Sequence, residues 1–386
     1  MSARPQLAPI TPEVVSWAVD RSGYSVEEIA SAIGQPADAI KGWLDGSAQP
    51  TVSQAKALAA KLKRPFALLL WSAPPKDDVP KMAFRAPVAS EMRDLNPVER
   101  RYIRQAVRLQ GGMIWVRQEL NDEPFRFPGI RADSSPADAA EVARSALGIS
   151  IETQLGWKTE YEAFRQWRAV FEARGLCVFS LSLGSDSCRG MTLASEQAPV
   201  IVINTAWNPN ARIFTLFHEL GHVLSRTTSA CATSWAKTTE PMYNPIERWC
   251  EEFAATALLP LHAVEAHLRR IRVSKVTDIH TAGGIARTFK VSLQAATLRL
   301  IETGHATWKL WDQIPRDANA KSGGGGAGAE PRTTPVIRLG EFGRAAAEVL
   351  VRGMRAEVLD RSQVASYLRV NDDALDEIEQ KLASDE

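Results

Sequence analysis

The segment from Asn208 to Leu224 reads NPNARIFTLFHELGHVL and carries the clearest structural signal in the chain. Asn208 can cap a helix, and Pro209 suits a first helical turn. Apolar residues then recur at i, i+4, i+7 and i+11, the stripe of a helix packed on a core. They are Ile213, Phe217, Leu220 and Leu224. This segment is therefore predicted to form an amphipathic helix that lies against the interior of the protein.

The same segment contains an H-E-x-x-H motif, formed by His218, Glu219 and His222. Because a helix has about 3.6 residues per turn, the two imidazoles lie about 40° apart around its axis and can reach one metal ion. Zinc held by two histidines, a third protein ligand and water is the arrangement of catalytic sites. The ion lowers the pKa of the water from about 15.7 to about 7, and Glu219 can accept the proton. The alternative is two histidines that satisfy each other in a helical core. It is less favoured because the motif helix is well capped and follows a strand.

A third ligand is expected from a second helical segment, residues 246–254, which precedes Pro260. Glu247 and Glu251 share a face of this segment at i and i+4, and Glu252 lies next to them. One carboxylate could bind the metal while another accepts a hydrogen bond from a ligand histidine. Spacing alone does not choose among the three glutamates, and an acidic face turned to solvent is the alternative.

Short β-prone stretches precede the motif helix, and three strands are predicted at 176–183, 190–193 and 199–204. The peptide substrate of a zinc hydrolase would pair in extended form with an edge strand, and the 189–193 or the 199–204 strand is the expected edge. A donor that stabilises the tetrahedral intermediate is also required. The candidates are Tyr243, His262 and His267. For the two histidines, ordinary surface positions are the alternative.

The two motif segments resemble those of the ImmA/IrrE family of zinc metallopeptidases. The family pattern reads roughly R-x-F-T-x-A-H-E-L-G-H and then E-x-x-A-N-x-F-A-x-x-L-L-M-P, which this chain follows at 212–222 and 247–260. The resemblance covers about residues 156–305. It implies a zincin-like fold, Zn²⁺ as the cofactor and peptide-bond hydrolysis.

The resemblance also implies roles for individual residues. The implied zinc ligands are His218, His222 and Glu247, the last being the first residue of the second motif. Glu219 would be the catalytic base. Glu251 stands where the family usually has Asn or Asp, and it would either support a ligand histidine by a hydrogen bond or compete for the metal. Cys250 replaces the usual Ala and places a thiol near the site.

Residues 25–46 have helix-turn-helix character, with the small Ala30 where two helices would cross and Gly34 at the turn. Residues 11–71 resemble the XRE-type helix-turn-helix domain often fused to ImmA/IrrE peptidases. The expected recognition helix, 37–44, offers Lys41 as its one basic side chain. Residues 1–72 hold seven Lys and Arg against six Asp and Glu, a net charge of +1. DNA binding through Lys41 and a domain retained for protein contact or dimerisation are therefore both open.

The composition excludes several classes of protein. The 386 residues are 45% hydrophobic and 24% charged, values of a globular chain rather than a collagen-like or disordered one. The 46 Lys and Arg nearly balance 45 Asp and Glu, so the whole chain is no polyelectrolyte that coats nucleic acid. No apolar run approaches the roughly 18 residues of a membrane helix, and the N-terminus lacks the apolar core of a signal peptide. A cytoplasmic protein is expected, whose four widely spaced cysteines are reduced thiols in its interior.

Five segments are expected along the chain. They are a helix-turn-helix domain at 1–72, a helical connector at 73–155, the zinc peptidase domain at 156–315, a Gly-rich linker at 316–335 and a helical tail at 336–386. The predicted fold class is α+β, mainly α, with a zincin-like core around a sheet of three or four strands and an all-α domain before it. The tail is expected either to mediate dimerisation or partner docking, or to pack against the peptidase domain.

Two functions agree with these features. The first is a zinc endopeptidase that cleaves a protein. The family resemblance implies that this protein is a transcriptional repressor, cut in a stress or mobile-element response. The second is a DNA-binding regulator or antitoxin-like protein that uses the peptidase fold as a sensor or docking module without proteolysis. A homodimer is expected and a membrane partner is not.

Overall fold

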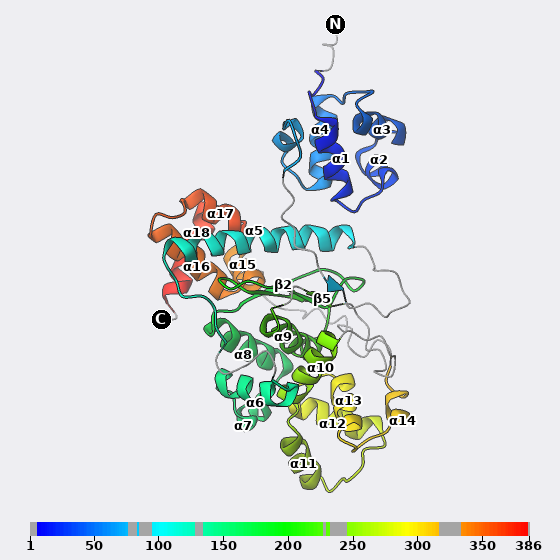
Figure 1. Ribbon diagram of the computed structural model, residues 1–386, viewed down its shortest axis with the longest axis vertical. Coiled ribbons are helices and arrows are strands. Elements are labelled where there is room, and N and C mark those ends of the chain that lie inside the picture. The colour runs from blue at the N-terminus through cyan, green and yellow to red at the C-terminus, as the bar shows by residue number, and fades with distance from the viewer. Residues whose placement is uncertain are drawn as a thin grey trace. The chain divides into compact units, whose positions relative to one another are not determined.

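The computed structural model describes residues 6–75, 83–84, 95–127, 134–226, 229–231, 245–315 and 333–384. These residues form two compact units (Figure 1). The N-terminal unit contains residues 6–75 and 95–105, and the C-terminal unit contains residues 83–84 and 106–384.

Helices make up the regular structure of the N-terminal unit in its described residues. They are α1 (Pro12–Asp20), α2 (Val26–Ile33), α3 (Ala37–Asp45), α4 (Val52–Leu62), a 3-10 helix (Phe66–Leu70) and the first turns of α5 (Pro97–Glu119). Ser25 begins α2 with a capping box to Glu28, and Gly34 ends it with φ 65°, a backbone conformation that glycine adopts easily. Ile40 and Trp43 are buried in the core of the unit. The predicted helices and the turn at Gly34 are confirmed, whereas the relation to DNA-binding helix-turn-helix domains stays a prediction.

The C-terminal unit contains a small sheet in the strand order β1-β5-β3-β4-β2. Three strands, β2 (Cys177–Leu181), β3 (Gly190–Leu193) and β4 (Val200–Asn204), lie where the sequence predicts them. β4 is parallel to β2 and antiparallel to β3. Two short strands that were not predicted, β1 (Ala83–Phe84) and β5 (Ser229–Cys231), bring the sheet to five strands in the described ranges.

The prediction that the 189–193 or the 199–204 strand forms a sheet edge is wrong. β4 lies between β2 and β3, and β5 pairs antiparallel with Gly190, Met191 and Thr192 of β3. The chain returns after the motif helix and adds a strand of its own, which satisfies the backbone groups that a substrate strand was expected to use. The edges of the described sheet are β1 and β2.

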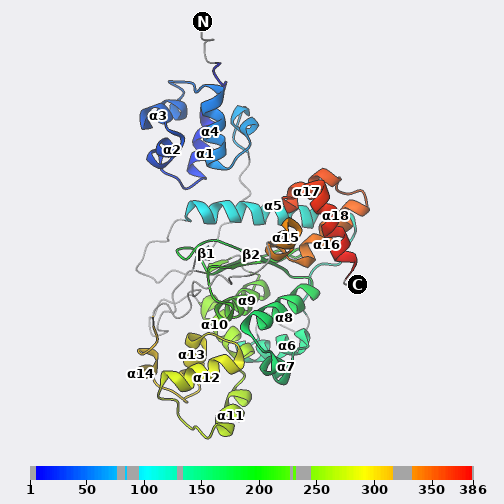
Figure 2. The same ribbon diagram turned by 180° about the vertical axis from the view of Figure 1, so that it is seen from behind.

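Helices cover both faces of this sheet (Figure 1, Figure 2). On one face, α8 (Glu160–Ala173) and α9 (Pro209–Leu224) pack together, with the rings of Trp167 and Phe217 edge to face at 4.8 Å. On the other face, α5 and the tail helices contact β2. There the Cys177 sulfur lies 3.6 Å from the sulfur of Met113 on α5. The sheet is thus the middle layer of the unit, and α9 is held in its interior.

The remaining helices of the peptidase region share one apolar core with α8 and α9. They are α6 (Pro136–Leu147), α7 (Ile151–Gly156), α10 (Pro245–Leu258), α11 (Leu261–Arg270), α12 (Ile279–Phe289), α13 (Leu293–Glu302) and α14 (Trp308–Trp311). α10 packs along α9 and continues against α6. This arrangement places the two helices that carry the sequence motifs side by side.

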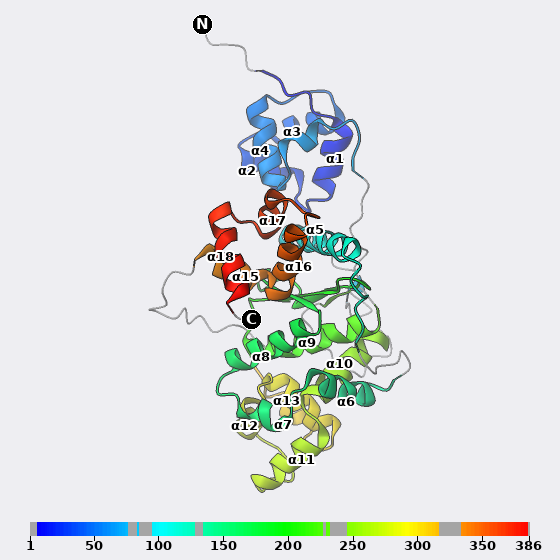
Figure 3. The same cartoon turned by 90° about the vertical axis from the view of Figure 1, so that its left-hand side faces the viewer.

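The tail forms four helices, α15 (Thr334–Phe342), α16 (Arg344–Arg355), α17 (Arg361–Leu368) and α18 (Asp372–Ala383). They lie against α5 and α8 (Figure 3), and Phe342 meets Phe179 of β2 edge to face at 5.8 Å. Arg168 of α8 donates hydrogen bonds to the carbonyl of Val178 at 2.6 Å and to that of Gly340 at 2.7 Å. Of the two expectations for the tail, packing against the peptidase region is therefore confirmed. A role in dimerisation stays a prediction.

The predicted fold class, α+β and mainly α, is confirmed. Cys177, Cys188 and Cys250 are buried as thiols, as expected, while the side chain of Cys231 lies outside the described residues. Burial raises the pKa of the Cys177 thiol to about 12, so this group is inert. None of the helices in the described ranges is both long and apolar enough to span a bilayer.

Candidate metal centre

The start of α9 is fixed by its capping residue and a buried arginine. The Asn208 side chain accepts a hydrogen bond from the N–H of Ala211 at 2.9 Å, as its predicted capping role requires. Arg212 donates to the carbonyls of Trp207 and Thr205, both at 2.6 Å. These bonds tie the first turn of α9 to the end of β4. Arg212, the first residue of the family pattern, therefore has a structural role, because its guanidinium donates hydrogen bonds to backbone carbonyls.

α9 and α10 approach each other closely at Gly221, which lies within the motif. A Cβ atom at this position would lie 2.8 Å from the sulfur, 3.0 Å from the Cβ and 3.1 Å from the Cα of Cys250. Such distances are below van der Waals contact, so only glycine fits. The contact sets the spacing of the two helices one turn away from Glu247 on α10.

The far end of α10 is held by two buried polar side chains. Gln154 of α7 donates to the carbonyls of Leu258 at 3.0 Å and Phe289 at 2.8 Å. Arg144 of α6 donates to the carbonyl of Ala257 at 2.8 Å and to the Gln154 side chain at 2.7 Å. The last carbonyls of α10 are thereby satisfied, and the helix is fixed along its length.

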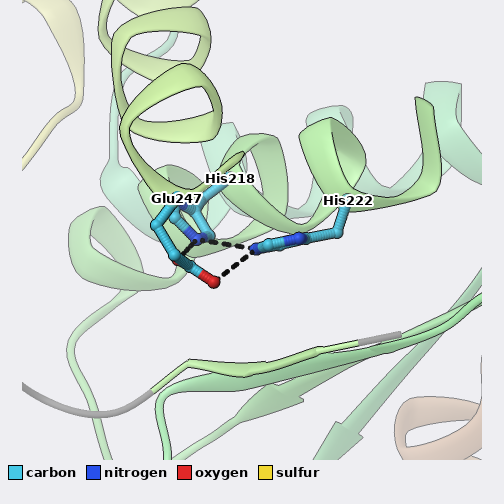
Figure 4. Close-up of side chains that lie close together, drawn as sticks. All are labelled: His218, His222 and Glu247. Carbon is cyan, nitrogen blue, oxygen red and sulfur yellow. Dashed lines mark hydrogen bonds and ion pairs between the residues drawn. The ribbon is translucent and has the colours of Figure 1, made fainter. Parts of the chain in front are cut away.

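Three of the predicted side chains meet between α9 and α10 (Figure 4). His218 Nε2 lies 3.2 Å from Glu247 Oε2, His222 Nε2 lies 3.3 Å from Glu247 Oε1, and the two Nε2 atoms are 3.2 Å apart. In a tetrahedral zinc site with bonds of about 2.0 Å, ligand atoms are about 3.3 Å apart. The donor atoms of His218, His222 and Glu247 therefore have the spacing of one face of such a tetrahedron. Among the described residues, these three side chains form the group that could hold a metal ion.

The group is buried, with exposed fractions of 3% for His218, 1% for His222 and 2% for Glu247. Burial lowers the pKa of His218 more than the nearby Glu247 carboxylate raises it. For Glu247, burial acts to raise the pKa, but polar contacts with the two histidines and their charge hold it well below its usual range. At neutral pH the centre offers a neutral His218 imidazole and a carboxylate, the protonation states that a zinc ion requires.

The donor set itself fits zinc. Glu247 Oε2 is fully buried yet receives no hydrogen bond of good geometry from the described residues, although His218 Nε2 is 3.2 Å away. Two imidazole nitrogens and a carboxylate converge there, and each can offer a lone pair. Buried polar groups normally have a partner, and a divalent cation would supply one for all three.

Glu219 is fully buried and turns toward the sheet. Its Oε2 accepts a hydrogen bond of 2.7 Å from the hydroxyl of Thr192 on β3. A Cβ atom at Gly190 would lie 2.9 Å from Glu219 Oε1 and would also collide with Thr215. β3 thus presents a glycine and a threonine to the side of α9 that carries Glu219.

Sequence analysis did not select Thr192 and Gly190 as site residues, although the strand contains a signal for them. Side chains two apart point to the same face of a strand, so Gly190 and Thr192 face one way and Met191 and Leu193 the other. All four residues are buried. A glycine and a threonine on the same buried face of a strand indicate that a polar group of a neighbouring element packs closely against that face.

The other predicted site residues lie outside the metal group. Glu251 is buried one turn beyond Glu247 on α10, and Glu252 is exposed. His262 is exposed at the start of α11, while His267 is buried and its ring meets Phe289 edge to face at 5.8 Å. Tyr243 lies outside the described residues. Lys41 is exposed on α3, and its ammonium is 3.5 Å from the Asp38 carboxylate.

A groove of about 510 Å³ opens at the C-terminal end of α9. Its apolar lining consists of Phe125, Phe127, Ala194, Val223 and Leu224. Arg226 and Glu196 form an ion pair of 2.7 Å at its rim. Val223 and Leu224 belong to the last turn of α9, and Ala194 directly follows β3.

Residues 171–300 match the family model described as the IrrE N-terminal-like domain, which belongs to peptidase family M78. The match runs from the end of α8 into α13 and contains Glu219 and the three residues of the metal group. The predicted resemblance to the ImmA/IrrE family is confirmed for this part of the chain. A comparison with curated proteins gives no match.

Proposed function

We propose that this protein is a zinc-dependent endopeptidase. The observation that carries the proposal is the triangle of His218, His222 and Glu247 donor atoms, 3.2 to 3.3 Å apart, inside a domain that matches a peptidase family. Zinc is the ion proposed because two imidazoles and one carboxylate leave a tetrahedral site with one open position. The buried His218, His222 and Glu247 would hold it.

Zinc in such a site acts as a Lewis acid toward water and the scissile carbonyl. Glu219 is the proposed general base, which takes a proton from the attacking water and returns it to the nitrogen of the leaving amine. The Thr192 hydroxyl donates a hydrogen bond to Glu219 Oε2 and thereby orients the carboxylate that would accept the proton. Glu251 is proposed to support the centre rather than bind the metal, because it lies outside the metal group.

The proposed substrate is another protein, a transcriptional repressor that is cleaved in a stress or mobile-element response. This step rests on the resemblance to the ImmA/IrrE family. The groove between residues 125–127, residues 194–196 and the end of α9 is proposed to receive an apolar side chain of the substrate. Five of its nine lining residues are apolar, and its volume of about 510 Å³ has room for a large aromatic side chain.

The test compares wild-type protein with the Glu219→Gln and His218→Ala variants. Each is loaded with zinc and incubated with a lysate of the source cells, and new protein N-termini are identified by mass spectrometry. Wild type should generate specific new termini, Glu219→Gln should bind zinc without generating them, and His218→Ala should lose the zinc. Equal cleavage by Glu219→Gln would refute the mechanism, and a wild-type protein that takes up no zinc would refute the proposal.

A second function, DNA-binding regulation, is favoured by the separate helical unit that precedes the peptidase region. In this alternative the peptidase fold is a sensor or docking module, in a cytoplasmic protein that forms homodimers. The buried thiols of Cys177, Cys188 and Cys250 support this proposed location. DNA binding that survives zinc removal, without any new protein termini in the cleavage assay, would favour this function over the first.

A further inference from the structure

One short segment of the C-terminal unit, residues 122–127, borders two cavities. The first is the groove of about 510 Å³ at the end of α9. The second has a volume of about 680 Å³ and is lined in part by α16 and α18, so we call it the tail cavity. Phe125 and Arg126 line both cavities. A single stretch of chain therefore separates the groove from the tail cavity, and we call residues 122–127 the groove wall.

The groove wall contributes two aromatic side chains to the groove. Phe125 and Phe127 are half-buried and alternate with the exposed Arg126, and both rings pack against the apolar core of the peptidase region. Phe125 also lies against Gly175, where an added Cβ atom would be 3.6 Å from its Cδ2, an ordinary contact distance. The position of these rings decides how much of the groove is open to a side chain of the substrate.

The opposite side of the groove, residues 194–196, is held firmly by α5. The buried Gln110 donates to the carbonyl of Leu193 at 2.9 Å and to that of Ala198 at 2.8 Å, and Arg117 donates to the carbonyl of Gln197. Leu193 and Ala198 flank the turn between β3 and β4, so this turn is fixed at both of its ends. The width of the groove therefore depends on the groove wall.

Two polar contacts tie the groove wall to its neighbours. The N–H of Phe125 donates to the carbonyl of Glu196 at 2.6 Å, on the opposite side of the groove. At the start of the groove wall, the Asp122 carboxylate forms an ion pair with the guanidinium of Arg352 on α16. A segment with a cavity on each side has few packing contacts to hold it. Its position therefore depends on polar contacts such as these two.

Arg352 is well suited to fix this segment, because α16 packs tightly on α5 at the next residue. A Cβ atom added to Gly353 would lie 2.5 Å from Cγ2 and 2.9 Å from Cγ1 of Val116, so a larger residue would force the two helices apart. Val116 is itself fully buried. The backbone that carries Arg352 is thus held in one place, and the ion pair connects that place to the groove wall.

We propose that Arg352 is a positioning residue for the substrate: through Asp122, it fixes the groove wall so that the groove accepts a large apolar side chain. This inference deepens the proposed function and rests on it for its effect on cleavage. It gives the tail a role in the choice of substrate. The exposed fractions of 50% for Arg352 and 24% for Asp122 limit the effect of the ion pair to about fivefold.

The full-length chain offers a matched control for the Arg352→Gln variant. Arg355 also belongs to α16, lines the tail cavity and is comparably exposed, but its partner, at 3.7 Å, is Glu379 of α18. Arg355→Gln removes the same charge and leaves the ion pair of Asp122 intact. Asp122→Asn breaks the ion pair from the other side, and the charge swap Asp122→Arg/Arg352→Asp rebuilds it. Thermal unfolding at the wild-type temperature shows that each variant is folded.

Binding is measured by NMR with zinc present, on protein labelled at the methyl groups of Ala, Leu and Val. The probe is N-acetyl-phenylalanine amide, and the reporters in the groove are the methyl groups of Ala194, Val223 and Leu224. The dissociation constant should rise about three- to fivefold in Arg352→Gln and in Asp122→Asn. Arg355→Gln and the charge swap should bind the probe like wild type.

Two further measurements follow the groove wall and the substrate. Hydrogen exchange of the Phe125 amide should accelerate about three- to fivefold in Arg352→Gln and stay unchanged in Arg355→Gln, because the ion pair holds the hydrogen bond to Glu196 closed. In the cleavage assay, Arg352→Gln should raise KM about three- to fivefold and leave kcat unchanged, the pattern of a residue that acts on substrate binding alone.

An unchanged dissociation constant in Arg352→Gln, an equal rise in Arg355→Gln, or no binding of the probe to wild type would overturn the inference. Shifts confined to the methyl groups of Val349, Val351 and Leu382 would also overturn it, because they would place the probe in the tail cavity. A wild-type protein that binds the probe, shows the expected variant effects and generates no new protein termini would refute the proposed peptidase activity. The role of Arg352 in positioning the groove wall would stand in that case, because the NMR titration requires no cleavage.

Discussion

Substitution of Gly221 by alanine tests how the metal centre is built. The new methyl carbon would lie 2.8 Å from the sulfur of Cys250, whereas atoms in good contact are about 3.5 to 4.0 Å apart. The two helices must therefore separate by about 0.7 Å or more, or distort locally. Glu247 lies one turn from Cys250 on α10 and would move with it. A metal site tolerates errors in ligand position of about 0.2 Å, so zinc binding should weaken.

We expect the zinc dissociation constant of Gly221→Ala to rise about 10- to 100-fold, the loss typical when support for a ligand is removed. The metal-free protein should change much less. Overpacking costs about 1 to 3 kcal/mol, while alanine favours a helix over glycine by about 1 kcal/mol. A net destabilisation of about 0 to 2 kcal/mol follows from these two terms. Zinc affinity is measured by competition with a chromophoric chelator, and stability by urea unfolding of the metal-free protein.

Gly111 provides a matched control, because it is an exposed helical glycine whose added Cβ would meet nothing within 4 Å. Gly111→Ala should stabilise the protein by about 1 kcal/mol without changing zinc affinity. Adding Cys250→Ala to Gly221→Ala removes the sulfur and should restore part of the zinc affinity. If Gly221→Ala binds zinc as tightly as wild type and gains the stability of Gly111→Ala, the proposed role of the helix crossing is wrong.

Three further predictions concern the base, the ligands and the tail. Thr192→Val should lower kcat of the cleavage identified above about tenfold and leave zinc affinity unchanged, because it removes the hydrogen bond that orients the Glu219 carboxylate. Thr192→Ser should retain activity, and a loss of zinc by Thr192→Val would contradict this role. The metal-free protein should lose stability as the pH falls below about 6.5, the ordinary pKa of histidine. Folding lowers the pKa of His218 and that of Glu247, so the unfolded chain binds more protons in this range. Thermal unfolding at a series of pH values measures the loss, and His218→Gln should flatten the upper part of the curve of stability against pH. Arg168→Gln should destabilise the protein by about 2 to 4 kcal/mol in urea unfolding without changing zinc affinity. The substitution breaks charged hydrogen bonds to the carbonyls of Val178 and Gly340 and removes the ion pair with Glu172. An unchanged unfolding midpoint would show that the tail is held by other contacts.

The sequence was sufficient to predict α9, because capping by Asn208 and the apolar stripe are local properties of seventeen consecutive residues. It was insufficient for β5, since Ser229–Cys231 is too short to show a strand pattern. Its pairing with β3 depends on where the chain returns after α9. The predicted sheet edge failed for this reason, as a non-local segment occupies it.

The choice among the three glutamates of α10 shows the same limit at the site. Helical spacing places Glu247 and Glu251 on one face, but the rotation of α10 about its axis is a property of its packing. Contact of Cys250 with Gly221, and of the far end of the helix with Arg144 and Gln154, fixes that rotation. Only the resemblance to a known family selected Glu247 from the sequence alone.

The thiol at Cys250 is explained by the same contact. It lies three residues from Glu247, yet it is outside the group that could hold a metal, and its sulfur packs where a side chain at Gly221 would be. A larger residue at one of the two positions demands a smaller one at the other, because the distance between α9 and α10 is set by the spacing that the three donor atoms need. The departure from the family pattern at this position therefore acts on the centre through the distance between two helices. It supplies no additional ligand.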